Sequence, residues 1–189
     1  MPRVVHLIRH GQSTFNAHYS ATGVDPLHFD ARLTELGRQQ VAAARERLAR
    51  QAYEVVLASP LTRAIETAEG IFGGRVPIEI TPLHREWQIS SCDIGRSLGE
   101  LTADFPHLDF SALGNPLGDP WWLHEGPLCE LGFPPETEAQ LADRIADFKD
   151  MIAQRRELRI AVVGHGDGGS RLIGRHLENC EMAEWDPQI

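Results

Sequence analysis

The sequence predicts an α/β protein with three layers (α/β/α), in which helices cover both faces of a mostly parallel β-sheet. Two observations predict this class. Four short runs rich in β-branched residues are bounded by turn residues, and segments with apolar residues at helical spacing separate these runs. Strands that alternate with helices need crossover connections, and such connections join parallel strands.

The four predicted strands are apolar enough to be buried on both faces, as strands of a covered parallel sheet are. They span residues 4–8, 53–58, 76–80 and 159–164. A short apolar run of this length is typical of a strand rather than of a helix. The first run begins almost at the start of the chain.

Two of the predicted helices carry clear start signals. The helix over residues 61–72 has apolar residues at helical spacing, and Ser59 is the expected N-cap with Pro60 in the first helical position. The helix that contains Leu141, Ile145, Phe148 and Ile152 follows the sequence Thr-Glu-Ala-Gln at residues 137–140, which is a capping-box pattern.

Two further helices complete the expected layers. One covers residues 34–50 and the other covers residues 170–180. The positions expected to face the core are Leu36, Val41, Ala44 and Leu48 in the former, which turns Arg45, Arg47 and Arg50 outward, and Leu172, Ile173, Leu177 and Cys180 in the latter.

Residues 86–135 interrupt this alternation because they are rich in Gly, Pro and aromatic residues, including the run PLGDPWW at residues 116–122. We expect one domain over residues 1–189, with this segment as an irregular insertion over the site. The alternative is a surface loop in which Trp121 and Trp122 fill a gap in the core.

Charge and composition exclude several classes of partner. The formal net charge of −9 opposes binding to nucleic acids and acidic membranes, which are polyanions. No apolar run approaches the roughly 20 residues of a membrane-spanning helix, and the start lacks the pattern of a signal peptide. Three cysteines without metal-ligand or redox spacing are typical of reduced thiols, so we expect a cytoplasmic protein.

Polar and cationic residues follow three of the predicted strands. Residues 9–16 follow the first strand, residues 59–63 the second and residues 164–170 the last. Because ligands of open parallel sheets bind at the carboxyl ends of the strands, we expect these segments to meet in space. A single histidine or arginine at such a place is more often structural, but their joint placement favours a functional site.

The residue types in these segments suit a phosphoryl group. Two arginine forks, from Arg9 and Arg63, and the imidazole of His165 can bind its charged oxygens while neutral His10 attacks phosphorus. Gly11, Gly164 and Gly166 would let the backbone approach the anion, and the helix after Gly166 would direct its N-terminus toward it.

Four ordered segments resemble the signatures of the histidine phosphatase superfamily, which is also called phosphoglycerate mutase-like. They are residues 9–11 (RHG), 33–40 (LTELGRQQ), 58–68 (ASPLTRAIETA) and 163–166 (VGHG). Residues 25–34 and 92–95 look most like the fungal and plant branch, which includes phosphatases. The resemblance implies a phosphoglycerate mutase-like fold and a phosphohistidine on His10. It also implies that Arg9, Arg63 and His165 hold the phosphoryl group in a pocket lined by Asn16. Gly166 is expected to bind substrate through the backbone approach described above.

The resemblance places the proton donor after the third strand, where Glu86 stands. Asp93 is the alternative, and a structural ion pair between Glu86 and Arg85 is a further one. The nine histidines show no metal-ligand motif such as His-Glu-x-x-His, so no metal and no cofactor are expected.

The expected function is a metal-independent phosphatase that hydrolyses a small phosphorylated metabolite. A phosphoglycerate mutase is the second enzyme reading, and a silent phosphate-binding module is a third. The chain is shorter than the glycolytic mutases that it resembles, and small and acidic residues follow His165 at residues 167–169. The further basic residues that a mutase uses for a second anionic group are therefore not expected, and this favours the hydrolase.

Overall fold

A five-stranded sheet forms the centre of the computed structural model, which describes residues 3–114 and 120–187. The strands are β1 (Val4–Arg9), β2 (Val55–Ala58), β3 (Ile78–Ile80), β4 (Arg159–Gly164) and β5 (Met182–Trp185). Their order in the sheet is β3-β2-β4-β1-β5, and all neighbours are parallel except β5, which runs antiparallel to β1. The mostly parallel α/β fold predicted from the sequence is therefore confirmed.

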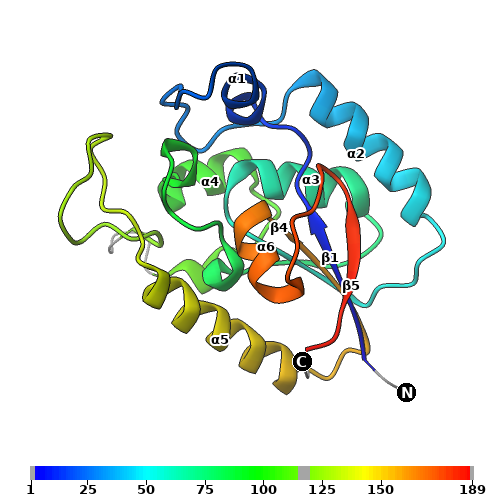
Figure 1. Ribbon diagram of the computed structural model, residues 1–189. Coiled ribbons are helices and arrows are strands. Elements are labelled where there is room, and N and C mark those ends of the chain that lie inside the picture. The colour runs from blue at the N-terminus through cyan, green and yellow to red at the C-terminus, as the bar shows by residue number, and fades with distance from the viewer. Residues whose placement is uncertain (1–2, 115–119, 188–189) are drawn as a thin grey trace.

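Helices pack on both faces of this sheet. They are α1 (Thr14–Thr22), α2 (Glu35–Leu48), α3 (Thr62–Phe72), α4 (Leu98–Asp104), α5 (Glu138–Gln154) and α6 (Gly166–Ile173). Figure 1 shows α2 and α5 on opposite sides of the sheet and α1 above the end to which β1 points. The connection after β1 thus places α1 beside the carboxyl ends of the parallel strands.

The alternation of side chains along β4 divides the core into two clusters. Ile160 and Val162 pack with Phe148 and Ile152 of α5, whereas Ala161 and Val163 pack in the cluster that contains α2 and α3 residues. Successive strand residues point to opposite faces. A strand with apolar residues at every position is therefore buried on both sides, as the sequence predicted.

Several elements differ from the sequence-based expectation. The last helix ends at Ile173, because Gly174 adopts a left-handed φ of 71° as its C-cap, and β5 rather than helix follows. Helices α1 and α4 were not predicted. Leu36, expected in the core, is exposed on α2. Thr137 caps α5 as predicted, with Gln140 completing the capping box.

The irregular segment at residues 86–135 contributes both to a pocket and to the hydrophobic core. Its beginning, including Glu86 and Asp93, lines a pocket at the carboxyl edge of the sheet. Trp121 instead packs against the larger core cluster and donates its indole N–H to the Arg96 carbonyl at 2.9 Å. Trp121 therefore behaves as the core-filling alternative expects. The Pro116–Asp119 part of the PLGDPWW run lies outside the described residues.

In the described part of the chain, no helix has the length and apolarity needed to cross a membrane. Within the same residues, Cys92, Cys129 and Cys180 are all free thiols.

Candidate active site

The three segments predicted to converge do meet at the carboxyl edge of the sheet. The His10 N–H donates to the Gly164 carbonyl at 2.9 Å, and the Ser59 N–H donates to the Val163 carbonyl at 3.1 Å. These main-chain bonds extend the pairing of β4 with β1 and β2. A cavity of about 310 Å³ opens here, and its lining includes Arg9, His10, Asn16, Arg63, Glu86, Asp93 and Gly166.

The tautomer of His10 follows from its two ring contacts. Nδ1 lies 2.7 Å from the Gly11 carbonyl oxygen, which can only accept, so Nδ1 carries the proton. Nε2 then holds a lone pair, and the Nε–H of Arg63 donates to it at 3.2 Å. His10 therefore presents the unprotonated nitrogen that a nucleophile requires.

Both site histidines are neutral because their surroundings oppose a charge. Burial, reinforced by Arg63 and Arg9, lowers the pKa of His10 well below its ordinary value. Burial, with Arg63 and His10 next in importance, does the same to the pKa of His165. The two rings lie edge to face with centroids 5.2 Å apart. The neutral form of His10 is thus favoured below the ordinary pKa of a histidine.

Ser59 is a site residue that sequence reasoning assigned elsewhere. Its hydroxyl lies 2.7 Å from His165 Nε2, whereas the N-cap of α3 is Leu61, which makes no side-chain cap bond. The expectation that Ser59 caps α3 is therefore wrong. His165 Nδ1 is buried without a hydrogen-bond partner among the described residues, and His165 does not line the cavity in this structure.

Arg63 is held by three groups at once. Besides its bond to His10, it donates to the Cys92 carbonyl at 2.5 Å and to the Asp93 carboxylate at 3.0 Å. The side chains of Arg63 and Asp93 are only 2% and 3% exposed, so this ion pair is almost fully desolvated. The planar guanidinium is therefore fixed in orientation beside His10.

Arg9 has an unused donor at the site. One terminal nitrogen donates to the Leu177 carbonyl at 2.7 Å. Its buried Nε has no hydrogen-bond partner among the described residues. Arg9 also lines the cavity, and guanidinium groups are suited to bind anionic oxygens.

The carboxylate of Glu86 lies at the N-terminus of α6, where the sequence predicted that the phosphoryl group binds. Its carboxylate accepts from the backbone N–H groups of Gly166, Asp167 and Gly168, at 2.7 to 3.2 Å, and from that of Trp87 at 2.9 Å. The N-terminus of α6 therefore binds a carboxylate of the protein itself, which the helix dipole favours. The expected use of this N-terminus for the phosphoryl group is not seen here.

The alternative acid, Asp93, lies deeper. It pairs with Arg63 and accepts from the backbone N–H groups of Ile89 and Ser90 at 3.3 and 3.0 Å. Burial raises the pKa of the Asp93 carboxyl above its usual range, against the opposing influence of Arg63. Both candidate acids line the same cavity.

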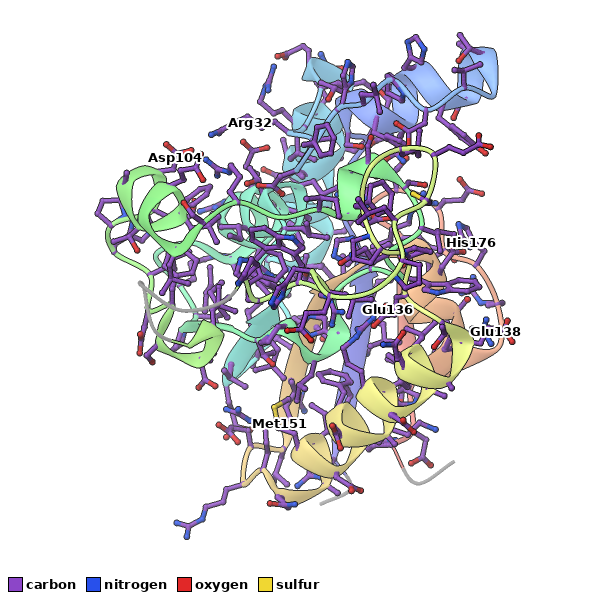
Figure 2. All side chains as sticks on the ribbon, turned by 90° about the vertical axis from the view of Figure 1, so that its left-hand side faces the viewer. Arg32, Asp104, Glu136, Glu138, Met151 and His176 are labelled. Carbon is purple, nitrogen blue, oxygen red and sulfur yellow. The ribbon has the colours of Figure 1, made fainter. Side chains whose placement is uncertain are left out.

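The main chain around Glu86 is held by a buried charge cluster. Arg144 of α5 donates to the carbonyls of Leu83 and Arg85, both at 2.9 Å, and to that of Glu86 at 3.3 Å. Its other contacts go to Glu136, which also pairs with Arg85 at 3.0 Å. Figure 2 shows Glu136 next to the N-terminal end of α5, where Glu138 begins the helix. Arg85 thus pairs with Glu136 and not with Glu86, so the expected alternative of a structural Arg85–Glu86 ion pair is wrong.

Sequence reasoning missed the walls of the cavity. Phe15 and Tyr19 of α1, Ile89, and the pair of His176 and Asp167 all line it. His176 lies beside α6 (Figure 2), with Nδ1 3.7 Å from the Asp167 carboxylate. Asn16, by contrast, was expected, although its side chain also completes the capping box of α1 with Ser13. No His, Cys, Asp and Glu cluster among the described residues has the arrangement of a metal site.

The fold and this site together define an α/β protein with a histidine- and arginine-lined pocket at the carboxyl edge of its sheet. The model of the histidine phosphatase superfamily (branch 1) matches residues 5–188. The chain belongs to the histidine phosphatase superfamily.

A curated relative is similar in sequence, and solved structures share the fold. A phosphoglycerate mutase-like protein of Arabidopsis thaliana is 29% identical over 234 aligned residues, covering 95% of this chain and 82% of the relative. The alpha-ribazole phosphatase of Shigella flexneri has the same fold, with a TM-score of 0.64 and 23% identity, over 97% of this chain and 90% of its own. A mycobacterial glucosyl-3-phosphoglycerate phosphatase gives a TM-score of 0.57 at 19% identity, over 96% and 90%.

Proposed function

We propose that this protein is a metal-independent phosphatase that hydrolyses a small phosphomonoester through a phosphohistidine on His10. The observation that carries the proposal is the unprotonated Nε2 of a buried, neutral histidine, held beside Arg63 at the base of the cavity. The fold is shared with proteins named as phosphatases, which supports a phosphatase reaction. The cytoplasm is the expected compartment.

In the first step, the lone pair of His10 Nε2 forms a bond to phosphorus as the bond from phosphorus to the ester oxygen breaks. The alcohol leaves with a proton from a general acid, for which we assign Glu86. In the second step, a water molecule attacks the phosphohistidine, gives a proton to the same carboxylate, and releases inorganic phosphate and free His10.

Arg9, Arg63 and His165 would stabilise the charge on the phosphoryl oxygens. Arg9 lines the cavity, and Arg63 is already oriented toward His10. Positioned donors of this kind supply the positive charge that a metal ion provides in metal-dependent phosphatases. Asn16 and Gly166, which line the same cavity, complete the assigned binding residues.

The proposal is tested by trapping the intermediate. Brief mixing with a radiolabelled phosphomonoester and an alkaline quench should leave label on the protein, because a phosphorus–nitrogen bond survives base and is lost in acid. The label should be absent from His10→Ala, whose folding is checked by urea unfolding. Turnover should continue in EDTA, and inorganic phosphate should appear.

Four results would contradict the proposal. Full turnover by His10→Ala would show that His10 is not the nucleophile. A loss of activity in EDTA that added metal restores would show that a metal ion, and not the arginines, supplies the positive charge. Transfer of the label between substrate hydroxyls without phosphate release would identify a mutase. Phosphate binding without any turnover would identify a binding module.

A further inference from the structure

The cavity extends beyond His10 between α1 and the start of α6, and this outer part must hold the leaving group if the proposed hydrolysis is correct. We propose that the substrate is a monophosphate ester whose leaving group is uncharged and carries an aromatic or apolar body, which packs between Tyr19 and Ile89. The inference rests on the proposed function and adds the class of alcohol that it releases.

An aromatic wall forms one side of the outer cavity. The rings of Phe15 and Tyr19 are stacked, with centroids 5.4 Å apart and an interplanar angle of 13°. Phe15 is 6% exposed, whereas Tyr19 is 49% exposed and lines the cavity. A ring supported from behind by a buried aromatic is already ordered, so a ligand that stacks on it does not bear that entropy cost.

An apolar side chain forms a further part of the wall. Ile89 lines the same cavity and is 44% exposed, which leaves much of its surface for contact with a ligand. The rest of this part of the lining includes the neutral side chains of Ser20 and Ser90. Recognition by apolar walls with a few polar groups is typical of sites for organic ligands.

The charges in the described lining are unevenly distributed. Arg9 and Arg63 stand beside His10, where the phosphoryl group binds, and no other arginine or lysine lines the described cavity. The outer part presents Asp167, and the one further basic side chain in the described lining, His176, has its Nδ1 3.7 Å from that carboxylate. A carboxylate or second phosphate on the leaving group would lack a cationic partner and face an acidic one.

Three esters with unactivated alcohols of similar acidity test the inference: benzyl, para-carboxybenzyl and methyl phosphate. The first two share a ring and a reacting bond and differ in charge, and the third has no ring. At about pH 8, we expect kcat/KM for the benzyl ester to exceed that for the methyl ester by at least about tenfold. The para-carboxybenzyl ester should fall clearly below the benzyl ester.

Variants connect this preference to the named walls. Tyr19→Ala should lower kcat/KM for benzyl phosphate by roughly 5- to 10-fold and much less for methyl phosphate, and Tyr19→Phe should restore it. Asp167→Asn should improve the para-carboxybenzyl ester relative to the benzyl ester. Phe29→Ala is the matched control, because Phe29 is an exposed aromatic that does not line the cavity.

The outcomes separate this inference from the proposed function. No phosphate release from any ester, p-nitrophenyl phosphate included, would defeat the hydrolysis itself. Release with equal kcat/KM for benzyl and methyl phosphate would overturn only the aromatic wall. A preference for the para-carboxybenzyl ester, or an equal loss on all esters in Tyr19→Ala, would likewise overturn the inference and leave the hydrolysis standing.

Discussion

Glu86 binds the N-terminus of α6 and is also the proposed general acid. Its carboxylate accepts four backbone hydrogen bonds, three from the N-terminus of α6 and one from Trp87, and these bonds hold it in place. A general acid must carry a proton when the alcohol leaves. We therefore expect its contribution to depend on how much protonation the leaving group needs.

Replacing Glu86 by glutamine tests this role. Glu86→Gln should slow hydrolysis of alkyl phosphates by about 10² to 10⁴, which is the usual contribution of general acid catalysis, and slow p-nitrophenyl phosphate far less. The ratio of kcat/KM for the two substrates is the measurement. A larger ratio change in Asp93→Asn would transfer the acid role to Asp93, and an equal loss on both substrates would indicate a structural effect.

Single residues near the strand ends were predictable because their motifs fix them to the sheet. His10, Arg63 and His165 follow three neighbouring strands, and the carboxyl ends of parallel strands share an edge. The position of the Glu86 carboxylate was not predictable in this way. It depends on contacts from Arg144, which is 58 residues further along the chain.

At the scale of elements, α5 is joined to the segment that carries Glu86 by charges rather than by apolar packing alone. Arg144 and Glu136 are 9% and 4% exposed, so removing one leaves a buried charge with fewer partners. Each of the arginine's three carbonyl acceptors lies between Leu83 and Glu86. We therefore expect the contacts of Arg144 to contribute both to stability and to the orientation of Glu86.

Arg144→Met should lower the free energy of unfolding by about 3 to 5 kcal/mol, the range for breaking a buried ion pair. In the fraction that remains folded, turnover of alkyl phosphates should fall more than that of p-nitrophenyl phosphate, because Glu86 loses its support. Urea unfolding and the kcat/KM ratio measure the two effects. Arg38→Met is the control, since its pair with Glu35 is exposed on α2 and should contribute under about 1 kcal/mol.

A stability loss in Arg144→Met no larger than in the control would contradict the importance of this cluster. An unchanged substrate ratio would restrict Arg144 to a structural role.

The predictability of elements followed the strength of their periodicity. The start of α5 was found because Thr137 and Gln140 form a capping box and its apolar residues recur regularly. Helix α1 contributes only Phe15 to the buried core, and β5 has one buried residue, Trp185. Elements with so few buried positions leave no periodic pattern, and their structure comes from the segments on which they pack.

At the scale of the whole molecule, buried histidines should make folding sensitive to acid. His84 donates from Nε2 to the Val163 carbonyl at 3.1 Å, and its buried Nδ1 has no hydrogen-bond partner among the described residues. Burial, with a smaller effect of Arg144, lowers its pKa from 6.5 to about 4 against the opposing bond to Val163. As the pH falls from about 6.5 to 4, the unfolded chain binds this proton before the folded chain does.

Stability should therefore fall over that window. For His84 alone, the loss between pH 7 and pH 5 should be about 2 kcal/mol. His10 and His165 act in the same direction, and Asp93, whose pKa is raised, acts in the opposite one. Comparing urea unfolding of the wild type with His84→Gln at each pH removes these shared contributions. An identical pH dependence of the free energy of unfolding in the two proteins would show that His84 does not cause the loss of stability.

The bond from Arg63 Nε–H to His10 Nε2 has a consequence for chemical reactivity. In the ligand-free protein, the lone pair that we propose attacks phosphorus already accepts a hydrogen bond from a cation. Attack requires Arg63 to release it, and a substrate's anionic oxygens offer that guanidinium a stronger acceptor. Electrophiles without negative charge provide no such exchange. We therefore expect uncharged acylating and alkylating reagents to modify His10 more slowly than exposed imidazoles such as those of His18 and His28.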